Sequence, residues 1–105
     1  DKFMDFYRRF VSDAAFQQRS VSNPLRYVTT DPDDDFNTIE GTLDHISGML
    51  QAPVAGRGHY HIRYGQTYDN PDGMILVKAG ISNGLMDILD FRQKDGEWKL
   101  VSYEN

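Results

Sequence analysis

Three short turn sequences divide the C-terminal half of the chain into four strand-like segments. Asn70-Pro71-Asp72-Gly73 separates the first pair, Asn83-Gly84 the second and Asp95-Gly96 the third. Asn-Gly and Asp-Gly favour two-residue hairpin turns, because both residues of a type I′ turn need a positive φ angle. The stretch from His59 to Tyr103 is therefore predicted to form four consecutive antiparallel β-strands.

The lengths of these turns predict which side chains share a face of the sheet. A four-residue turn at 70–73 sets Tyr64 opposite Ala79, and the two-residue turns then set Asp90 opposite both Val77 and Val101. Helices are expected to cover the resulting face, which combines aliphatic and polar side chains. Its members are Tyr60, Ile62, Tyr64, Gln66, Tyr68, Ile75, Val77, Ala79, Ile81, Met86, Ile88, Asp90, Val101 and Tyr103.

The acidic residue on this face predicts a pocket. A carboxylate at Asp90 among aliphatic neighbours is costly unless it accepts hydrogen bonds, which tyrosine hydroxyls or an amide can donate. The ligand-binding residues are therefore predicted to be Tyr60, Tyr64, Gln66, Asp90 and Tyr103. In the alternative, Asp90 lies at the margin of the sheet and pairs with a basic neighbour, Arg92 or Lys99, while the tyrosines bury their rings and keep their hydroxyls in water.

The opposite face of the predicted sheet is also apolar in its last strands. One layer of helices cannot cover two faces, so something else is expected to cover this one. A two-fold homodimer through the outer sheet face is the simplest candidate, and an upstream segment of a longer protein is the other. The residues concerned are Leu76, Leu89, Phe91, Trp98 and Leu100.

His59 and His61 lie two positions apart on one strand, which places their Cα atoms about 7 Å apart. This spacing binds zinc or nickel when a third ligand arrives, here from Asp44, His45 or Asp87. The pattern is more typical of an edge strand kept polar against aggregation. We therefore predict no metal and no cofactor.

The first half of the chain is predicted to be mainly helical. Apolar residues recur every three or four positions at Phe3, Phe6, Tyr7, Phe10, Val11 and Ala14. This periodicity indicates an amphipathic helix, followed by a short helical turn that stops before Asn23-Pro24. A short strand is expected over 25–30. A third helix is expected over 42–52, capped by Thr42 and ended by Pro53.

The acidic run 31–35 lacks the calcium loop's glycine and bidentate glutamate, because Phe36 and Thr42 occupy those positions. It is predicted to be a solvated loop instead.

The chain has 105 residues, a net charge of −5 and no cysteine. Its length predicts a single domain over 1–105. The negative charge argues against nucleic acid and anionic membrane surfaces, and no apolar run reaches the roughly 20 residues of a membrane span. The absence of cysteine excludes disulfides, thiolate zinc sites and a thiol nucleophile.

Two patterns resemble known families. Phe10-x-x-Asp13-x-x-Phe16-Gln17-x-x-x-Val21-x-x-Pro24-Leu25 resembles an uncharacterised family of secreted bacterial proteins, catalogued only as a domain of unknown function. The ending from Asp90 to Leu100, with Trp98 after the Asp-Gly turn, resembles the last hairpin of the nuclear-transport-factor-like (SnoaL-like, cystatin-like) superfamily. The resemblance implies an α+β cone, in which a curved antiparallel sheet has N-terminal helices packed on its concave face. It also implies a periplasmic or extracellular location, with a lipid anchor in the full-length protein as one option, and it supplies no catalytic residues.

These observations lead us to expect an exported, non-catalytic module that binds a small molecule or a partner protein in the cone pocket. The alternative is a small enzyme of the isomerase, cyclase or dehydratase type, in which Asp90 acts with Tyr64 or Tyr103 in proton transfer. A third option is a structural domain of a cell-envelope complex.

Overall fold

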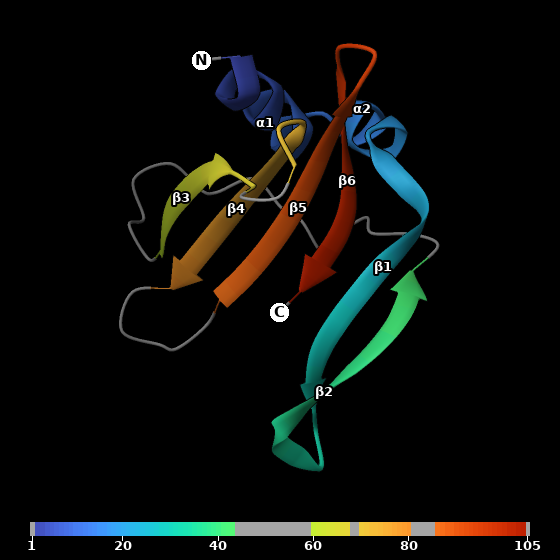
Figure 1. Cartoon of the computed structure of the whole chain (residues 1–105), viewed down its shortest axis with the longest axis vertical. Coiled ribbons are helices and arrows are strands. Elements are labelled where there is room, and N and C mark those ends of the chain that lie inside the picture. Colours follow the sequence, from blue (N-terminus) through green and yellow to red (C-terminus); the bar gives the residue numbers. More distant parts are fainter. Residues whose placement is uncertain (1, 44–59, 68–69, 81–85, 105) are drawn as a thin grey trace.

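The computed structural model describes residues 2–43, 60–67, 70–80 and 86–104. Within these ranges two helices precede six strands that form one sheet, in the order β2-β1-β6-β5-β4-β3 (Figure 1). Neighbouring strands are antiparallel except β1 and β6, which run parallel. The fold is therefore of the α+β class with a mixed sheet. The elements are α1 (Lys2–Ser12), α2 (Ala14–Arg19), β1 (Val21–Asp31), β2 (Asp34–Leu43), β3 (Tyr60–Gln66), β4 (Gly73–Gly80), β5 (Met86–Lys94) and β6 (Glu97–Glu104).

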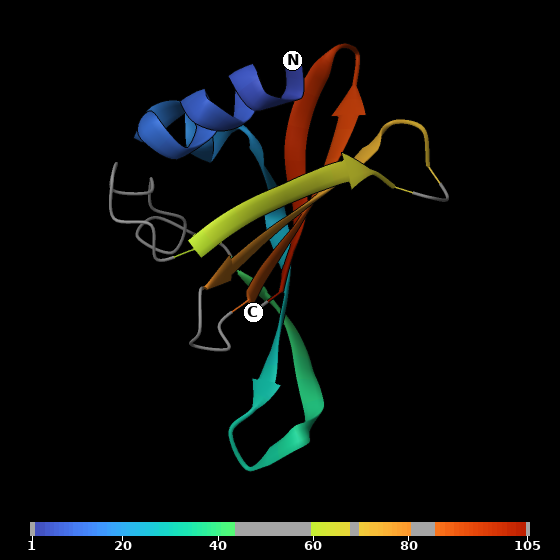
Figure 2. The same ribbon diagram turned by 90° about the vertical axis from the view of Figure 1, so that its left-hand side faces the viewer.

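The two helices confirm the aromatic periodicity read from the sequence. On α1, Phe3, Tyr7 and Phe10 are buried along one stripe. Asp13 separates the helices, because its backbone is extended (φ −125°, ψ 105°) and its carboxylate accepts a hydrogen bond of 3.0 Å from the Phe16 amide. It thus caps the N-terminus of α2. Both helices lie on the same side of the sheet (Figure 2).

The segment after the helices forms a hairpin rather than a strand and a helix. The strand expected over 25–30 is confirmed and extended in β1, and the acidic run 31–35 connects it to β2. Thr42 and Leu43 belong to β2, so the predicted helix is wrong at its start, while 44–52 lie outside the described residues. The hairpin β1–β2 projects away from the helices (Figure 1).

The four consecutive antiparallel strands of the C-terminal half are confirmed as β3 to β6. At the last turn, Asp95 and Gly96 have φ angles of 55° and 81°. Both are positive, as a type I′ turn requires. The Asn83-Gly84 turn lies outside the described residues.

The predicted register of β3 is wrong. Tyr64 pairs with Leu76 rather than Ala79, which shifts the strand by three residues. The loop closes earlier than expected, because the Thr67 amide donates a hydrogen bond of 3.0 Å to the Gly73 carbonyl. The Gly73 amide in turn donates one of 3.0 Å to the Asn70 carbonyl. An odd shift exchanges the two faces of a strand, so every side chain of β3 lies on the face opposite to the predicted one.

A β-bulge makes part of the β6 register differ from the prediction as well. Phe91 pairs with Leu100 as predicted, but Asp90 pairs with Ser102, so Val101 is an extra residue on β6. The bulge moves Tyr103 from opposite Ile88 to opposite Leu89.

Between β4 and β5 the shift is two residues, with Ala79 rather than Ile81 opposite Met86. An even shift keeps the predicted faces of these two strands.

The core lies on the face that the sequence analysis assigned to the outside. The Phe91 ring is fully buried, with centroids of Phe3 and Phe10 on α1 each 5.4 Å away. Large apolar side chains from the central strands complete this core, each at most 1% exposed: Leu25, Leu76, Leu89 and Leu100. The helices cover this face because it offers larger apolar side chains than the alternate positions do. The argument for a dimer through Leu76, Leu89, Phe91, Trp98 and Leu100 therefore loses its premise.

Candidate functional site

The structure separates the phenols of the predicted pocket from its carboxylate. The Tyr64 ring lies 5.4 Å from Phe3 on the helix-covered face. Tyr103 lies on the same face, is 4% exposed and stacks on Tyr27 at 5.7 Å. Asp90 pairs with Ile75 and Ser102, at positions that alternate with this face. The prediction that Tyr64, Tyr103 and Asp90 share one pocket is therefore wrong.

Asp90 instead forms an ion pair on its own strand. Its two carboxylate oxygens accept hydrogen bonds from the Arg92 guanidinium at 3.0 and 3.1 Å. This confirms the alternative of a pair with a basic neighbour, and it removes the geometry that an enzyme using Asp90 with either tyrosine requires. Gln66 donates to the Pro71 carbonyl at 2.9 Å, within the turn. The Tyr60 side chain lies outside the described residues.

A second set of hydrogen-bonded polar side chains lies across strands β2, β1 and β6. The Arg26 guanidinium donates to both Glu40 oxygens, at 2.8 and 3.2 Å, and to the Ser102 hydroxyl at 3.0 Å. The hydrogen bond and the charge of Arg26 lower the pKa of Glu40, and the same hydrogen bond raises the pKa of Arg26. Both side chains are more than half exposed, so the pair stabilises the fold only slightly.

Most of the residues considered as metal ligands lie outside the described residues. His59, Asp44 and His45 lie outside the described residues, as does the His61 side chain. Within the described ranges, no three potential ligands gather as a metal site would need. Over the same ranges, no helix has both the length and the hydropathy to cross a bilayer.

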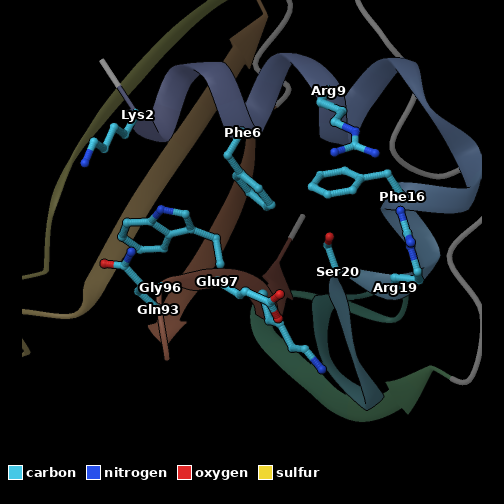
Figure 3. A pocket seen from close by; sticks show the side chains of 11 residues that line it. Lys2, Phe6, Arg9, Phe16, Arg19, Ser20, Gln93, Gly96 and Glu97 are labelled. Atoms are coloured by element: carbon cyan, nitrogen blue, oxygen red, sulfur yellow. The ribbon is translucent and has the colours of Figure 1, made fainter.

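A cleft of about 530 Å³ opens where α1 and α2 meet the β5–β6 hairpin (Figure 3). The helices supply basic and aromatic side chains, and the hairpin supplies its turn and the start of β6. The lining residues are Lys2, Phe6, Arg9, Phe16, Arg19, Ser20, Gln93, Gly96, Glu97, Trp98 and Lys99.

The junction between the helices shapes this cleft. Because α1 ends at Ser12 and α2 restarts after Asp13, Phe16 turns back toward Phe6, and their ring centroids lie 5.6 Å apart, edge to face. The Arg9 guanidinium lies 4.1 Å from the Phe16 ring centroid and 3.8 Å from the Asp13 carboxylate. Figure 3 shows Arg9 above the Phe16 ring and the Ser20 hydroxyl pointing toward that ring.

The β-hairpin closes the cleft from the other side. The Ser20 carbonyl accepts a hydrogen bond of 2.7 Å from the Leu100 amide, which ties the end of α2 to β6. Trp98 packs edge to face on Phe3 with centroids 5.2 Å apart, so its indole joins the helical aromatic cluster.

Of the predicted ligand-binding residues whose side chains the structure describes, none lines this cleft: Tyr64, Gln66, Asp90 and Tyr103. The sequence analysis missed Arg9, Phe16, Arg19, Ser20 and Lys99, because a helical aromatic stripe is usually core and the basic residues are scattered along the chain. The one local signal was Arg8-Arg9, the only adjacent basic pair. The rest of the cleft exists only after the hairpin packs against the helices.

Comparison with known proteins supports the fold. A family model described as a domain of unknown function (DUF4348) matches residues 1–105. An NTF2-like protein from Bacteroides fragilis NCTC 9343 is 38% identical with a TM-score of 0.76, over 97% of this chain and 45% of that one. This chain thus spans less than half the length of that relative.

An NTF-2 like protein of unknown function from Silicibacter pomeroyi DSS-3 shares the fold at 14% identity and a TM-score of 0.54, over 98% of this chain and 87% of its own. No curated protein matches the chain. The resemblance inferred from the sequence motifs is confirmed.

Proposed function

This chain belongs to the DUF4348 family of uncharacterised NTF2-like domains, and we propose that it is a binding module whose cleft between the helices and the β5–β6 hairpin takes a small molecule. The cleft volume of about 530 Å³ carries this proposal. Sites for small molecules typically enclose about 300–1,000 Å³, with aromatic walls and a few polar groups that orient the ligand. Phe6, Phe16 and Trp98 supply such walls here.

The single tryptophan provides the assay. Trp98 lines the cleft, so a bound compound should change its fluorescence and raise the melting temperature by mass action. Phe16→Ala should weaken the response, because it removes a half-buried wall of the cleft. Phe36→Ala is the matched control, since Phe36 is 98% exposed on the distant hairpin. Compounds that bind equally to both variants would reject the cleft as the site.

A partner protein is the second candidate, and the projecting β1–β2 hairpin favours it. Phe36 and Ile39 are 98% and 47% exposed there, next to the acidic run 31–35. Phe36 thus offers an exposed aromatic ring that a partner protein can cover, beside acidic residues that can pair with a basic partner. A partner on the hairpin would be lost with Phe36→Ser and kept with Phe16→Ala, whereas a ligand of the cleft would show the reverse.

Export stays a prediction, and so does dimerisation, although the apolar face first expected to form the dimer interface is covered by the helices. Fractionation of cells that carry the full-length protein tests the first, and recovery in the cytoplasm would contradict it. Light scattering at high protein concentration tests the second, and a monomer would contradict it.

A further inference from the structure

The cleft concentrates positive charge on an acidic chain. The protein has 16 acidic and 11 basic residues, yet the described residues that line the cleft include four bases, Lys2, Arg9, Arg19 and Lys99, and one acid, Glu97. More than a third of the basic residues thus lie around one concave surface. Charges of one sign around low-dielectric walls focus the electrostatic potential on the space that they enclose.

Three of these four cations form no ion pair with a described residue. They are Lys2, Arg19 and Lys99, whereas Arg9 lies 3.8 Å from the Asp13 carboxylate. The Arg19 guanidinium is 5.8 Å from the Phe16 ring centroid, where it adds to the cation–π contact made by Arg9. The Arg19 guanidinium, beside the aromatic wall of the cleft, is therefore available to a ligand.

A buried hydroxyl points to the same place. Ser20 is only 5% exposed, and its hydroxyl has no hydrogen-bond partner among the described residues. Figure 3 shows it directed into the cleft, toward Phe16. The hydroxyl is not among the fully buried unpaired atoms, so it keeps contact with solvent and can donate a hydrogen bond to a ligand acceptor atom.

We propose that the cleft recognises an amphipathic anion, in which a carboxylate, sulfonate or phosphate group meets Arg19 and Ser20 while a ring system packs on Phe6, Phe16 and Trp98. This inference rests on the proposed binding function and specifies the chemical class of the ligand. Guanidinium and hydroxyl donors give charge-assisted hydrogen bonds to oxyanions, and the aromatic walls offer flat apolar surface to the rest of the molecule.

A pair of dyes tests the charge preference directly. Anilinonaphthalene sulfonate carries an aromatic body and one sulfonate, and N-phenylnaphthylamine is its uncharged parent. The sulfonate should bind the protein at least about tenfold more tightly than the parent, because charge-assisted hydrogen bonds contribute more than neutral ones. Added salt should reduce this preference by screening the cations.

Three variants locate the effect. Arg19→Gln and Ser20→Ala should weaken sulfonate binding, by about tenfold for the arginine and less for the serine, and leave the parent dye unaffected. Arg8→Gln is the matched control, since Arg8 lies on α1 outside the cleft with its side chain 72% exposed. Circular dichroism of each variant confirms that it is folded. Displacement of the dye by benzoate or by inorganic phosphate then distinguishes a carboxylate ligand from a phosphate ligand.

The outcomes separate this inference from the function on which it rests. If both dyes bind equally and both are lost with Phe16→Ala, the binding cleft stands and the anion preference is overturned. If Arg8→Gln weakens the sulfonate as much as Arg19→Gln does, the preference is a general charge effect and the inference also fails. If neither dye responds to Phe16→Ala, the proposed binding function itself is rejected.

Discussion

Replacing Phe91 by alanine tests the assignment of the core to the face that carries Leu76, Leu89, Phe91 and Leu100. Phe91 is fully buried, and four aromatic rings of α1 lie edge to face with it at 5.4–6.3 Å. Phe→Ala in a packed core costs about 3–5 kcal/mol, from lost burial and the cavity left behind. A domain of this kind has about 5–15 kcal/mol of stability in total, so the loss is a large fraction of it.

Phe36→Ala provides the control for the same chemical change. Its ring is 98% exposed, so the variant should stay within about 0.5 kcal/mol of the parent protein. Phe91→Leu keeps most of the buried volume and should lose less than Phe91→Ala.

Urea unfolding followed by Trp98 fluorescence and circular dichroism measures all three changes. In a separate thermal melt, the melting temperature of Phe91→Ala should fall by more than about 12 °C, since each kcal/mol of lost unfolding free energy lowers it by roughly 4–8 °C in a domain of this size. A loss below about 1 kcal/mol for Phe91→Ala, or an equal loss for Phe36→Ala, would refute the face assignment. Such a result would place the helices on the other side of the sheet, where Asp90 lies.

Two further predictions concern the hairpins. The hydrogen bond from Arg26 lowers the pKa of Glu40 below its ordinary 4.5. The pair therefore stabilises the fold above pH 4.5, and this stabilisation is lost as the pH falls through the lowered pKa. NMR titration should show that Arg26→Gln raises the Glu40 pKa, and an unchanged pKa would contradict the pair. Gly73→Ala should cost about 1–3 kcal/mol, because an added Cβ meets the Thr67 hydroxyl and lies 2.9 Å from the Thr67 Cβ. Gly65→Ala meets nothing within 4 Å and should be neutral or slightly stabilising, so equal losses in thermal melts of the two variants would contradict the tight β3–β4 turn.

Local patterns in the sequence determined the elements. The aromatic periodicity predicted α1, the turn residues predicted the four C-terminal strands, and the positive φ angles of Asp95 and Gly96 follow from their residue types. These features depend on neighbours within a few positions, so the pattern of residue types is enough to predict them. The family motifs, which lie along the same segments, predicted the class of fold, and the comparisons confirmed it.

Only the tertiary structure decided which side chains share a face of the sheet and which residues line the cleft. The early closure of the loop at Thr67 and the bulge at Val101 each shift a strand by an odd number of residues, which places Tyr64 and Tyr103 opposite the face of Asp90. Likewise, Arg19 and Trp98 are 79 positions apart by their numbers and line one cleft only because the end of α2 bonds to β6. Strand alternation makes such outcomes depend on single-residue offsets, and the point where a loop closes or a bulge forms is not encoded by residue type alone.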